Sequence, residues 1–241
     1  MSTATIPPRI RAGNRMSEAL IEALPDLEPG DPMVLTGVTW AMYERLLVER
    51  DRIRPGVRLT YDRGRLEIMT VSRIHERWKG VLRRLLERLT DELQIPIVCG
   101  GSLTIRRADL ERGLEPDECY YVQNALQMVE MRELDFTVDI PFDLVIEVEQ
   151  SRTIGSRLPV LDQLGVPEVW LYNGKSLRIL QRQPDGGYRD AATSMAFPQL
   201  LPADWERFMS RMGELDDMAI VREFMDWIRT TLIPRLSPDN S

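Results

Sequence analysis

The residues best suited to chemistry in this sequence are acidic, and they gather in two segments. Pro116-Asp117 lies at the start of one predicted strand, and Glu147-Val148-Glu149 lies at the end of another. Alternate side chains of a strand share a face, so Glu147 and Glu149 point the same way. Carboxylates held this close repel one another without a cation, and Mg²⁺ prefers oxygen ligands. An ion bound there would polarise a phosphodiester and activate an attacking water.

The same acidic residues have a second interpretation that needs no metal. Glu149 could mark the exposed end of its strand, and Asp117 could belong to a turn. A Glu-x-Glu pair at a strand end is a weak signal, so spacing alone leaves both interpretations open.

A long amphipathic helix over residues 73–93 is the clearest element around these segments, and Ser72 stands at its N-cap position. Its apolar residues follow helical spacing: Ile74, Trp78, Val81, Leu82, Leu85, Leu86, Leu89 and Leu93. A shorter helix over 40–52 precedes it, capped by Thr39. The arginines of the long helix predict a solvated face, with a phosphate-tracking surface as the alternative.

The strands are short and are separated by turn residues. A hairpin is predicted from Val57 to Ile68 with Asp62-Arg63-Gly64 as its turn, and a second one around Asn173-Gly174, the preferred type I′ pair. Further strands are predicted over 95–98, 102–106, 115–122 and 143–149. A helix over 154–164, ended by Gly165, should follow the last of these.

Three parts follow from this pattern: an N-terminal arm over 1–35, an α/β domain over 36–190 and a helical extension over 191–241. The extension carries Phe224, Met225 and Trp227 close together on one helix. This is more large apolar surface than a lone terminal helix needs, so we expect an apolar patch there to form a homodimer.

Composition excludes several classes of protein. The 241 residues carry a net charge of -7, which argues against a passive nucleic-acid coat, although a nucleic-acid enzyme stays compatible with it. No apolar run approaches the roughly 18 residues of a membrane-spanning helix, and the N-terminus lacks the apolar core of a secretory signal. The 2 cysteines are too few for a disulfide framework or a structural zinc site. We therefore expect a cytoplasmic protein that does not enter a membrane.

Three segments together resemble a known family. They are GRLEIMTVSRIHE (64–76), LEPDECYYVQN (114–124) and PFDLVIEVEQSRTIGSRLPVLDQLGVPEVWLYNGKSLRIL (141–180). In this order they resemble the Uma2 family, once called DUF820, which is similar to restriction endonucleases of the PD-(D/E)xK superfamily. The resemblance implies a restriction-endonuclease-like α/β core, with a mixed β-sheet flanked by helices. It also implies a divalent-metal-dependent endonuclease that uses Mg²⁺ or Mn²⁺.

The resemblance also assigns residues. Asp117 matches the Asp of the PD motif and Glu147 the acidic residue of (D/E)xK, so both are implied metal ligands. Glu149 occupies the position of the superfamily Lys. Arg157 matches a helix position where many relatives carry Lys. An arginine there can stabilise developing charge but cannot act as a base at neutral pH.

Two further residues fall near the site by the same resemblance. Glu67 is an implied auxiliary acidic group at the end of its hairpin strand. His75, the single histidine, opens the long helix. A structural role and a role as proton shuttle or water-positioning group stay open for it.

The expected function is hydrolysis of nucleic-acid phosphodiester bonds, with DNA favoured over RNA as the partner. A non-catalytic protein that keeps the nuclease scaffold and acts by binding or oligomerisation is the main rival, because the superfamily Lys is missing. A metal-dependent hydrolase of small phosphoesters is a third possibility.

Overall fold

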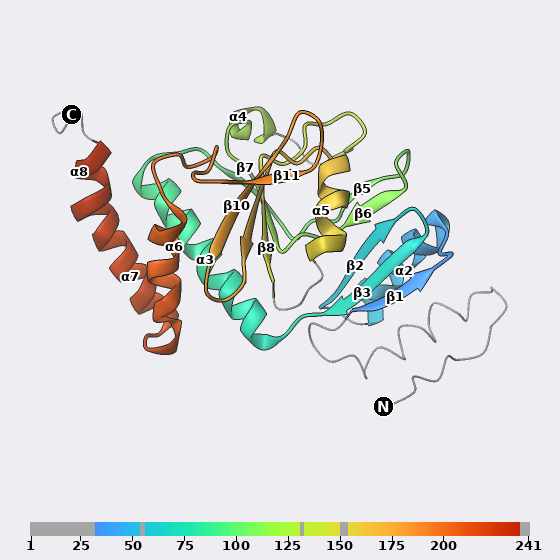
Figure 1. The fold of residues 1–241 in the computed structure, drawn as a ribbon, viewed down its shortest axis with the longest axis horizontal. Coiled ribbons are helices and arrows are strands. Elements are labelled where there is room, and N and C mark those ends of the chain that lie inside the picture. Colours follow the sequence, from blue (N-terminus) through green and yellow to red (C-terminus); the bar gives the residue numbers. More distant parts are fainter. Residues whose placement is uncertain (1–31, 54–55, 131–132, 150–153, 237–241) are drawn as a thin grey trace.

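The computed structural model describes residues 32–53, 56–130, 133–149 and 154–236, and it contains two β-sheets with helices around them (Figure 1). Most of the expected N-terminal arm, residues 1–31, lies outside the described residues. The α/β class expected from the sequence is confirmed, but the strands divide between two sheets. No described helix has the length and apolar character needed to cross a bilayer.

The first sheet is antiparallel throughout its five strands. Its order is β1 (Met33–Thr36), β3 (Arg65–Thr70), β2 (Val57–Asp62), β6 (Arg112–Leu114) and β5 (Ile105–Arg107). The β2–β3 hairpin turns through Arg63 and Gly64, whose φ values of 42° and 90° are those that a type I′ turn requires. The predicted hairpin is therefore confirmed.

The second sheet has six strands and is mixed. Its order is β11 (Tyr188–Ala191), β10 (Leu177–Arg182), β9 (Glu168–Tyr172), β8 (Leu144–Val148), β7 (Glu118–Tyr121) and β4 (Val98–Gly101). Strands β8 and β9 are parallel and are joined through helix α5 (Ile154–Gln163), whereas the other pairs are antiparallel. Gly165 follows α5 with a φ of 80°, as predicted for its C-terminal end.

The division into two sheets corrects the sequence-based strand assignments. Gly100-Gly101 was expected to interrupt one strand region, but the two glycines form the end of β4, and β5, which follows, belongs to the other sheet. Strand β6 was not predicted, because Arg112-Gly113-Leu114 is too short to show a period. The chain passes from β6 to β7 through Glu115, Pro116 and Asp117, so this short segment joins the two sheets.

The second hairpin is present, but its turn type was predicted wrongly. Four residues, 173–176, separate β9 from β10, and Asn173 does not have the positive φ that a type I′ turn requires. Instead, Asn173 Oδ1 accepts hydrogen bonds from the backbone N–H groups of Lys175 and Ser176 at 3.0 and 2.9 Å. A Cβ on Gly174 would lie 2.5 Å from the Trp78 ring, so the loop also depends on this glycine.

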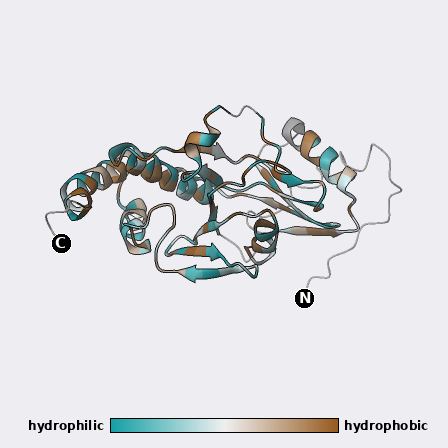
Figure 2. Cartoon of the chain, turned by 90° about the horizontal axis from the view of Figure 1, so that it is seen from above, coloured by the Kyte–Doolittle hydropathy of each residue, from teal (hydrophilic) through white to brown (hydrophobic). Residues whose placement is uncertain are grey.

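Helices α2 (Trp40–Ile53) and α3 (Arg73–Glu92) form where the sequence predicts them. Thr39 Oγ1 accepts from Met42 N at 3.3 Å, and Ser72 Oγ accepts from His75 N at 3.1 Å. The helices carry hydrophilic and hydrophobic residues in alternation, as expected of elements with one buried side (Figure 2). A short helix α4 (Ala125–Met128) follows β7.

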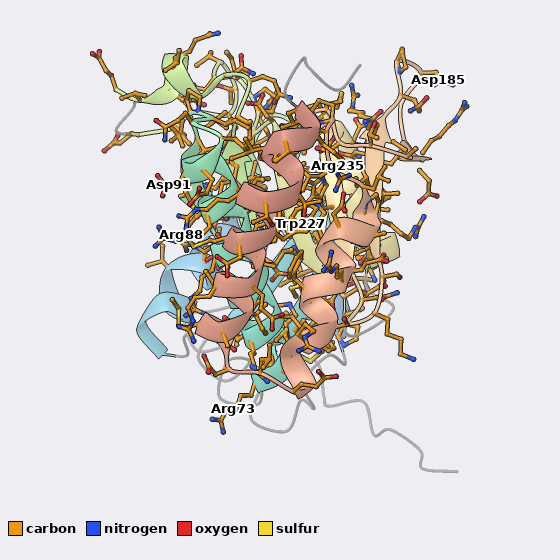
Figure 3. The ribbon with its side chains drawn as sticks, turned by 90° about the vertical axis from the view of Figure 1, so that its left-hand side faces the viewer. Arg73, Arg88, Asp91, Asp185, Trp227 and Arg235 are labelled. Atoms are coloured by element: carbon orange, nitrogen blue, oxygen red, sulfur yellow. The ribbon has the colours of Figure 1, made fainter. Side chains whose placement is uncertain are left out.

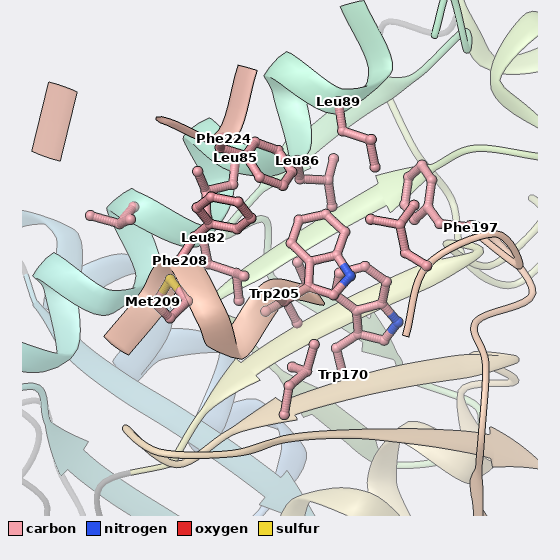
Figure 4. Packing of buried hydrophobic residues seen from close by; sticks show 14 of the residues in the cluster. Leu82, Leu85, Leu86, Leu89, Trp170, Phe197, Trp205, Phe208, Met209 and Phe224 are labelled. Atoms are coloured by element: carbon pink, nitrogen blue, oxygen red, sulfur yellow. The ribbon is translucent and has the colours of Figure 1, made fainter. Parts of the chain in front are cut away.

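The C-terminal region consists of α6 (Pro202–Met209), a 3₁₀ turn (Ser210–Gly213), α7 (Asp217–Trp227), a π-helical turn (Ile228–Leu232) and α8 (Ile233–Leu236). Helix α6 lies beside α7 over α3, with Trp227 close to their contact (Figure 3). Together with α3 and strands β8 to β10 they enclose one hydrophobic cluster. Figure 4 shows α3 leucines in this cluster facing Trp170, Trp205 and Phe224.

This packing removes the reason for which a homodimer was expected. Phe224 is fully buried and Trp227 is 6% exposed, because both pack against α3 and α6 within the same chain. Charged residues strengthen the same contact: Arg77 binds Asp217 at 3.0 Å and donates to Met212 O at 2.9 Å, and Arg84 binds Asp217 at 3.1 Å. Part of the basic face of α3 is therefore used to hold α7.

Candidate active site

Asp117 and Glu147 lie side by side where the two sheets meet. Glu118 pairs with Ile146 across β7 and β8, so one step further along this antiparallel register Asp117 stands opposite Glu147. Both side chains are buried, with 3% and 4% of their surface exposed. The backbone N–H of Val148 donates to Asp117 Oδ2 at 2.7 Å and fixes that carboxylate against β8.

His75 contacts Asp117 from the first turn of α3. Its Nε2 lies 3.0 Å from Asp117 Oδ2, and its side chain is almost fully buried. Burial by itself lowers the pKa of His75, but the hydrogen bond and charge of Asp117 outweigh it, so the pKa lies above its ordinary value. For Asp117, burial acts to raise the pKa, yet the hydrogen bond and charge of His75 and the charge of Arg157 hold it below the ordinary value. Each partner thus favours the charged form of the other.

Arg157 contacts Glu147 from α5. Its Nη2 donates to Glu147 Oε1 and to the backbone oxygen of Glu115, each at 2.7 Å, and its Nη1 donates to Thr60 Oγ1 at 2.9 Å. Burial raises the pKa of Glu147 to about 7, although the charge of Arg157 opposes that rise. Burial acts to lower the pKa of Arg157, but the charge and hydrogen bond of Glu147 raise it overall.

A second ion pair lies next to this one and was not expected from the sequence. Arg58 of β2 donates through Nη1 to Glu115 Oε1, and its Nη2 lies 3.8 Å from Glu76 Oε1. Strand β2 was predicted to alternate, but it is buried on both faces. Its apolar side packs on α2, while Arg58 and Thr60 face the site. The charged Arg58 between apolar residues was the sequence feature that could have indicated a buried polar face on this strand.

Glu67 lies beside the site without touching its two central carboxylates. Its Oε2 accepts from Ser156 Oγ at 2.8 Å and from Arg65 Nη1 at 3.1 Å. Ser156 immediately precedes Arg157 on α5. The observed contacts therefore connect Glu67 to the helix that carries Arg157.

Glu149 lines the same crevice, but within the described ranges it makes no hydrogen bond to Asp117 or Glu147. Its backbone N–H donates to Tyr172 O at 2.7 Å, which extends the pairing of β8 with β9 by one residue. Burial raises the pKa of Glu149, and the charge of Arg178 partly opposes the rise.

The crevice between the sheets collects these groups in one place. It is lined by Arg58, Met69, Asp117, Glu147, Val148, Glu149, Ile154, Arg157 and Leu171. The walls come from β2 and β3 of the first sheet, from β8 and β9 of the second, and from α5, which lies between the sheets (Figure 1). The structure thus brings His75 into contact with Asp117 and Arg157 into contact with Glu147, on adjoining strands.

The donor set suits a lightly held cation better than a closed metal cage. In the part of the chain that the structure describes, no group of three or more His, Cys, Asp or Glu side chains is arranged to hold a metal. Among the described residues, Asp117 Oδ2 and Glu147 Oε1 accept every hydrogen bond made to these two carboxylates, which leaves Asp117 Oδ1 and Glu147 Oε2 as ligands. Two carboxylate oxygens fit Mg²⁺, which keeps several waters and takes few protein ligands.

Comparison with known families decides where this chain belongs. A family model described as "Putative restriction endonuclease" matches residues 40–210, well over half of the chain. The chain belongs to the Uma2 family. The match to Uma2 covers every residue of the candidate site, from Arg58 to Arg157.

One solved structure similar to this Uma2 chain bears the description "putative nuclease belonging to DUF820" and comes from Anabaena variabilis. It is 14% identical, with a TM-score of 0.43, and the similarity covers 63% of this chain and 90% of that one. No curated protein matches the chain.

Proposed function

We propose that this Uma2 protein is a divalent-metal-dependent endonuclease that hydrolyses phosphodiester bonds in nucleic acid. The observation that carries the proposal is the position of Asp117 opposite Glu147 at adjoining strand ends, each with one oxygen unused by hydrogen bonds within the described ranges. The Uma2 description as a restriction endonuclease supports the reaction class. DNA is the favoured substrate.

Asp117 and Glu147 would hold Mg²⁺ or Mn²⁺. The bound ion would polarise the phosphodiester and lower the pKa of the attacking water. His75 holds Asp117 Oδ2, and Arg157 holds Glu147 Oε1, so each basic residue orients one carboxylate. Glu149 faces the same crevice and would assist there, whereas Glu67 would act through Ser156 by fixing α5.

One observation favours a second candidate, the non-catalytic nuclease scaffold. Asp117 and Glu147 each already have a basic partner, so their repulsion is relieved without a metal. In addition, Glu149 and Arg157 stand where the resemblance places lysines. A scaffold that acts through binding alone would keep the two pairs and bind no metal.

Calorimetric titration with Mn²⁺ and Mg²⁺ separates the two candidates. Asp117→Asn and Glu147→Gln keep side-chain shape and remove charge, and the exposed Asp109→Asn serves as the matched control. We expect metal binding by the wild type and the control, loss of binding in both site variants, and parallel loss of plasmid nicking. A wild-type protein that binds neither metal would establish the scaffold interpretation.

A further inference from the structure

The two arginines of the crevice use their guanidinium groups differently. Arg157 is bonded through both terminal nitrogens, with Nη2 shared between Glu147 and the backbone of Glu115 and Nη1 given to Thr60. Only 4% of its side chain is exposed. Both terminal nitrogens of Arg157 are thus committed to the protein, and among the described residues only its Nε lacks a hydrogen-bond partner.

Arg58 keeps one edge of its guanidinium uncommitted. Nη1 is bonded to Glu115, but Nε has no hydrogen-bond partner among the described residues, and Nη2 lies 3.8 Å from Glu76 Oε1, beyond hydrogen-bond distance. Nε and Nη2 form the side-on edge of the guanidinium fork, which matches two oxygens of one phosphate. Arg157 lacks such an edge, because its Nη2 already serves two acceptors.

The unpaired donor of Arg58 is a buried one. The side chain is only 9% exposed and lines the crevice together with Asp117 and Glu147. A buried donor without an acceptor is costly and is rare in native proteins, so it requires an explanation. Arg157 Nε is unpaired as well, but only in Arg58 does the unpaired Nε stand beside an Nη2 without a hydrogen bond, so an anionic group at this edge would supply acceptors for both nitrogens.

We propose that the Nε and Nη2 edge of Arg58 binds a phosphate of the nucleic-acid substrate, and that Arg157 is a positioning residue for Glu147. This proposal rests on the proposed nuclease function and assigns the phosphate contact within it. It reverses the role that the family resemblance implies for Arg157. The side-on edge of Arg58 faces substrate, whereas Arg157 acts through Glu147.

The test measures binding of a fluorescein-labelled DNA duplex in EDTA by anisotropy, over a series of KCl concentrations. The variants are Arg58→Gln, Arg58→Lys and Arg157→Gln. Arg106→Gln is the matched control, because it removes one positive charge from the same sheet at an exposed position. Working without metal separates the phosphate contact from cleavage.

We expect Arg58→Gln to weaken DNA binding about 10-fold and to reduce the slope of log K against log salt by about one, as loss of one phosphate contact does. Arg58→Lys should keep the slope but regain only part of the affinity, because an ammonium presents no fork. Arg157→Gln and Arg106→Gln should keep the wild-type slope. A purely structural role of Arg58 would not change this slope.

Arg58→Gln also leaves Glu115 without Arg58, so circular dichroism and thermal melting accompany each titration. The double variant Arg58→Gln/Glu115→Gln removes both charges and serves if the single variant does not fold. A wild-type slope in a folded Arg58 variant, with wild-type DNA still bound, would overturn this proposal and leave the nuclease function intact. A wild-type protein that neither binds DNA nor nicks plasmid would overturn both.

Discussion

Helix α3 meets its neighbours in two contrasting ways along its length. Beyond its first turns, Val81, Leu85 and Leu89 are fully buried against the second sheet and the C-terminal helices. At the first turn, His75 is nearly as deeply buried but faces Asp117. Burial of apolar side chains stabilises the fold, whereas a buried charge pair is often no more stable than an apolar replacement. The polar end of α3 is therefore better explained by chemistry than by stability.

The largest expected effect lies at the apolar end. Trp205 is 1% exposed and packs on Trp170 and Phe224. Trp205→Ala removes this contact and leaves a cavity, so we expect the free energy of unfolding to fall by about 3–5 kcal/mol in urea titrations. Metal affinity of the folded variant should stay at the wild-type value. A variant that loses metal binding while folded would show that the two ends of α3 are coupled.

The next effect concerns the polar end. Arg157→Met leaves Glu147 buried without its partner, and we expect a loss of about 3 kcal/mol of unfolding free energy. The double variant Arg157→Met/Glu147→Leu should regain most of it, because no buried charge stays unpaired. A double variant as unstable as the single one would mean that this pair is a main source of stability. That result would contradict the contrast between the apolar and polar ends of α3.

Sequence patterns predicted the apolar end better than the polar one. The spacing of leucines in 73–93 predicts both the helix and its buried face, because local periodicity records which side packs. The grouping of Asp117 with Glu147 followed from family motifs. Arg58 and Glu115 could not be found this way, since their contact joins residues far apart in sequence and depends on how the two sheets meet. The packing of Trp227 within its own chain could not be found from the sequence for the same reason.

A smaller effect is expected where α3 holds α7 through partly exposed charges. Arg77 is 37% exposed and Asp217 is 32% exposed. Arg77→Gln removes hydrogen bonds to Asp217 and to two backbone oxygens, so we expect a loss of about 1 kcal/mol of unfolding free energy. Measured by thermal melting, the loss should shrink in high salt. An unchanged loss at high salt would assign it to the backbone contacts instead.

The smallest effect is expected for the exposed pair of Arg178 and Asp190. Hydrogen bonds from Arg178 hold the pKa of Asp190 below its ordinary value. The pair therefore contributes stability above the ordinary pKa of aspartate and loses it as pH falls through the lowered pKa. Arg178→Gln should cost less than about 0.5 kcal/mol at neutral pH, and nothing once Asp190 is protonated. Urea titrations at neutral and strongly acidic pH check this, and a larger cost in acid would contradict it.

The three-residue passage from β6 to β7 has a consequence for how this family can vary. This segment connects the two sheets, and it also supplies two acidic groups of the site, Glu115 and Asp117. A strand shifted by a single residue presents its opposite face. An insertion or deletion here would thus turn Asp117 away from Glu147 even if every side chain were retained. Among relatives that keep the contact of this aspartate with the neighbouring strand, we expect this segment to change by substitution while its length stays constant.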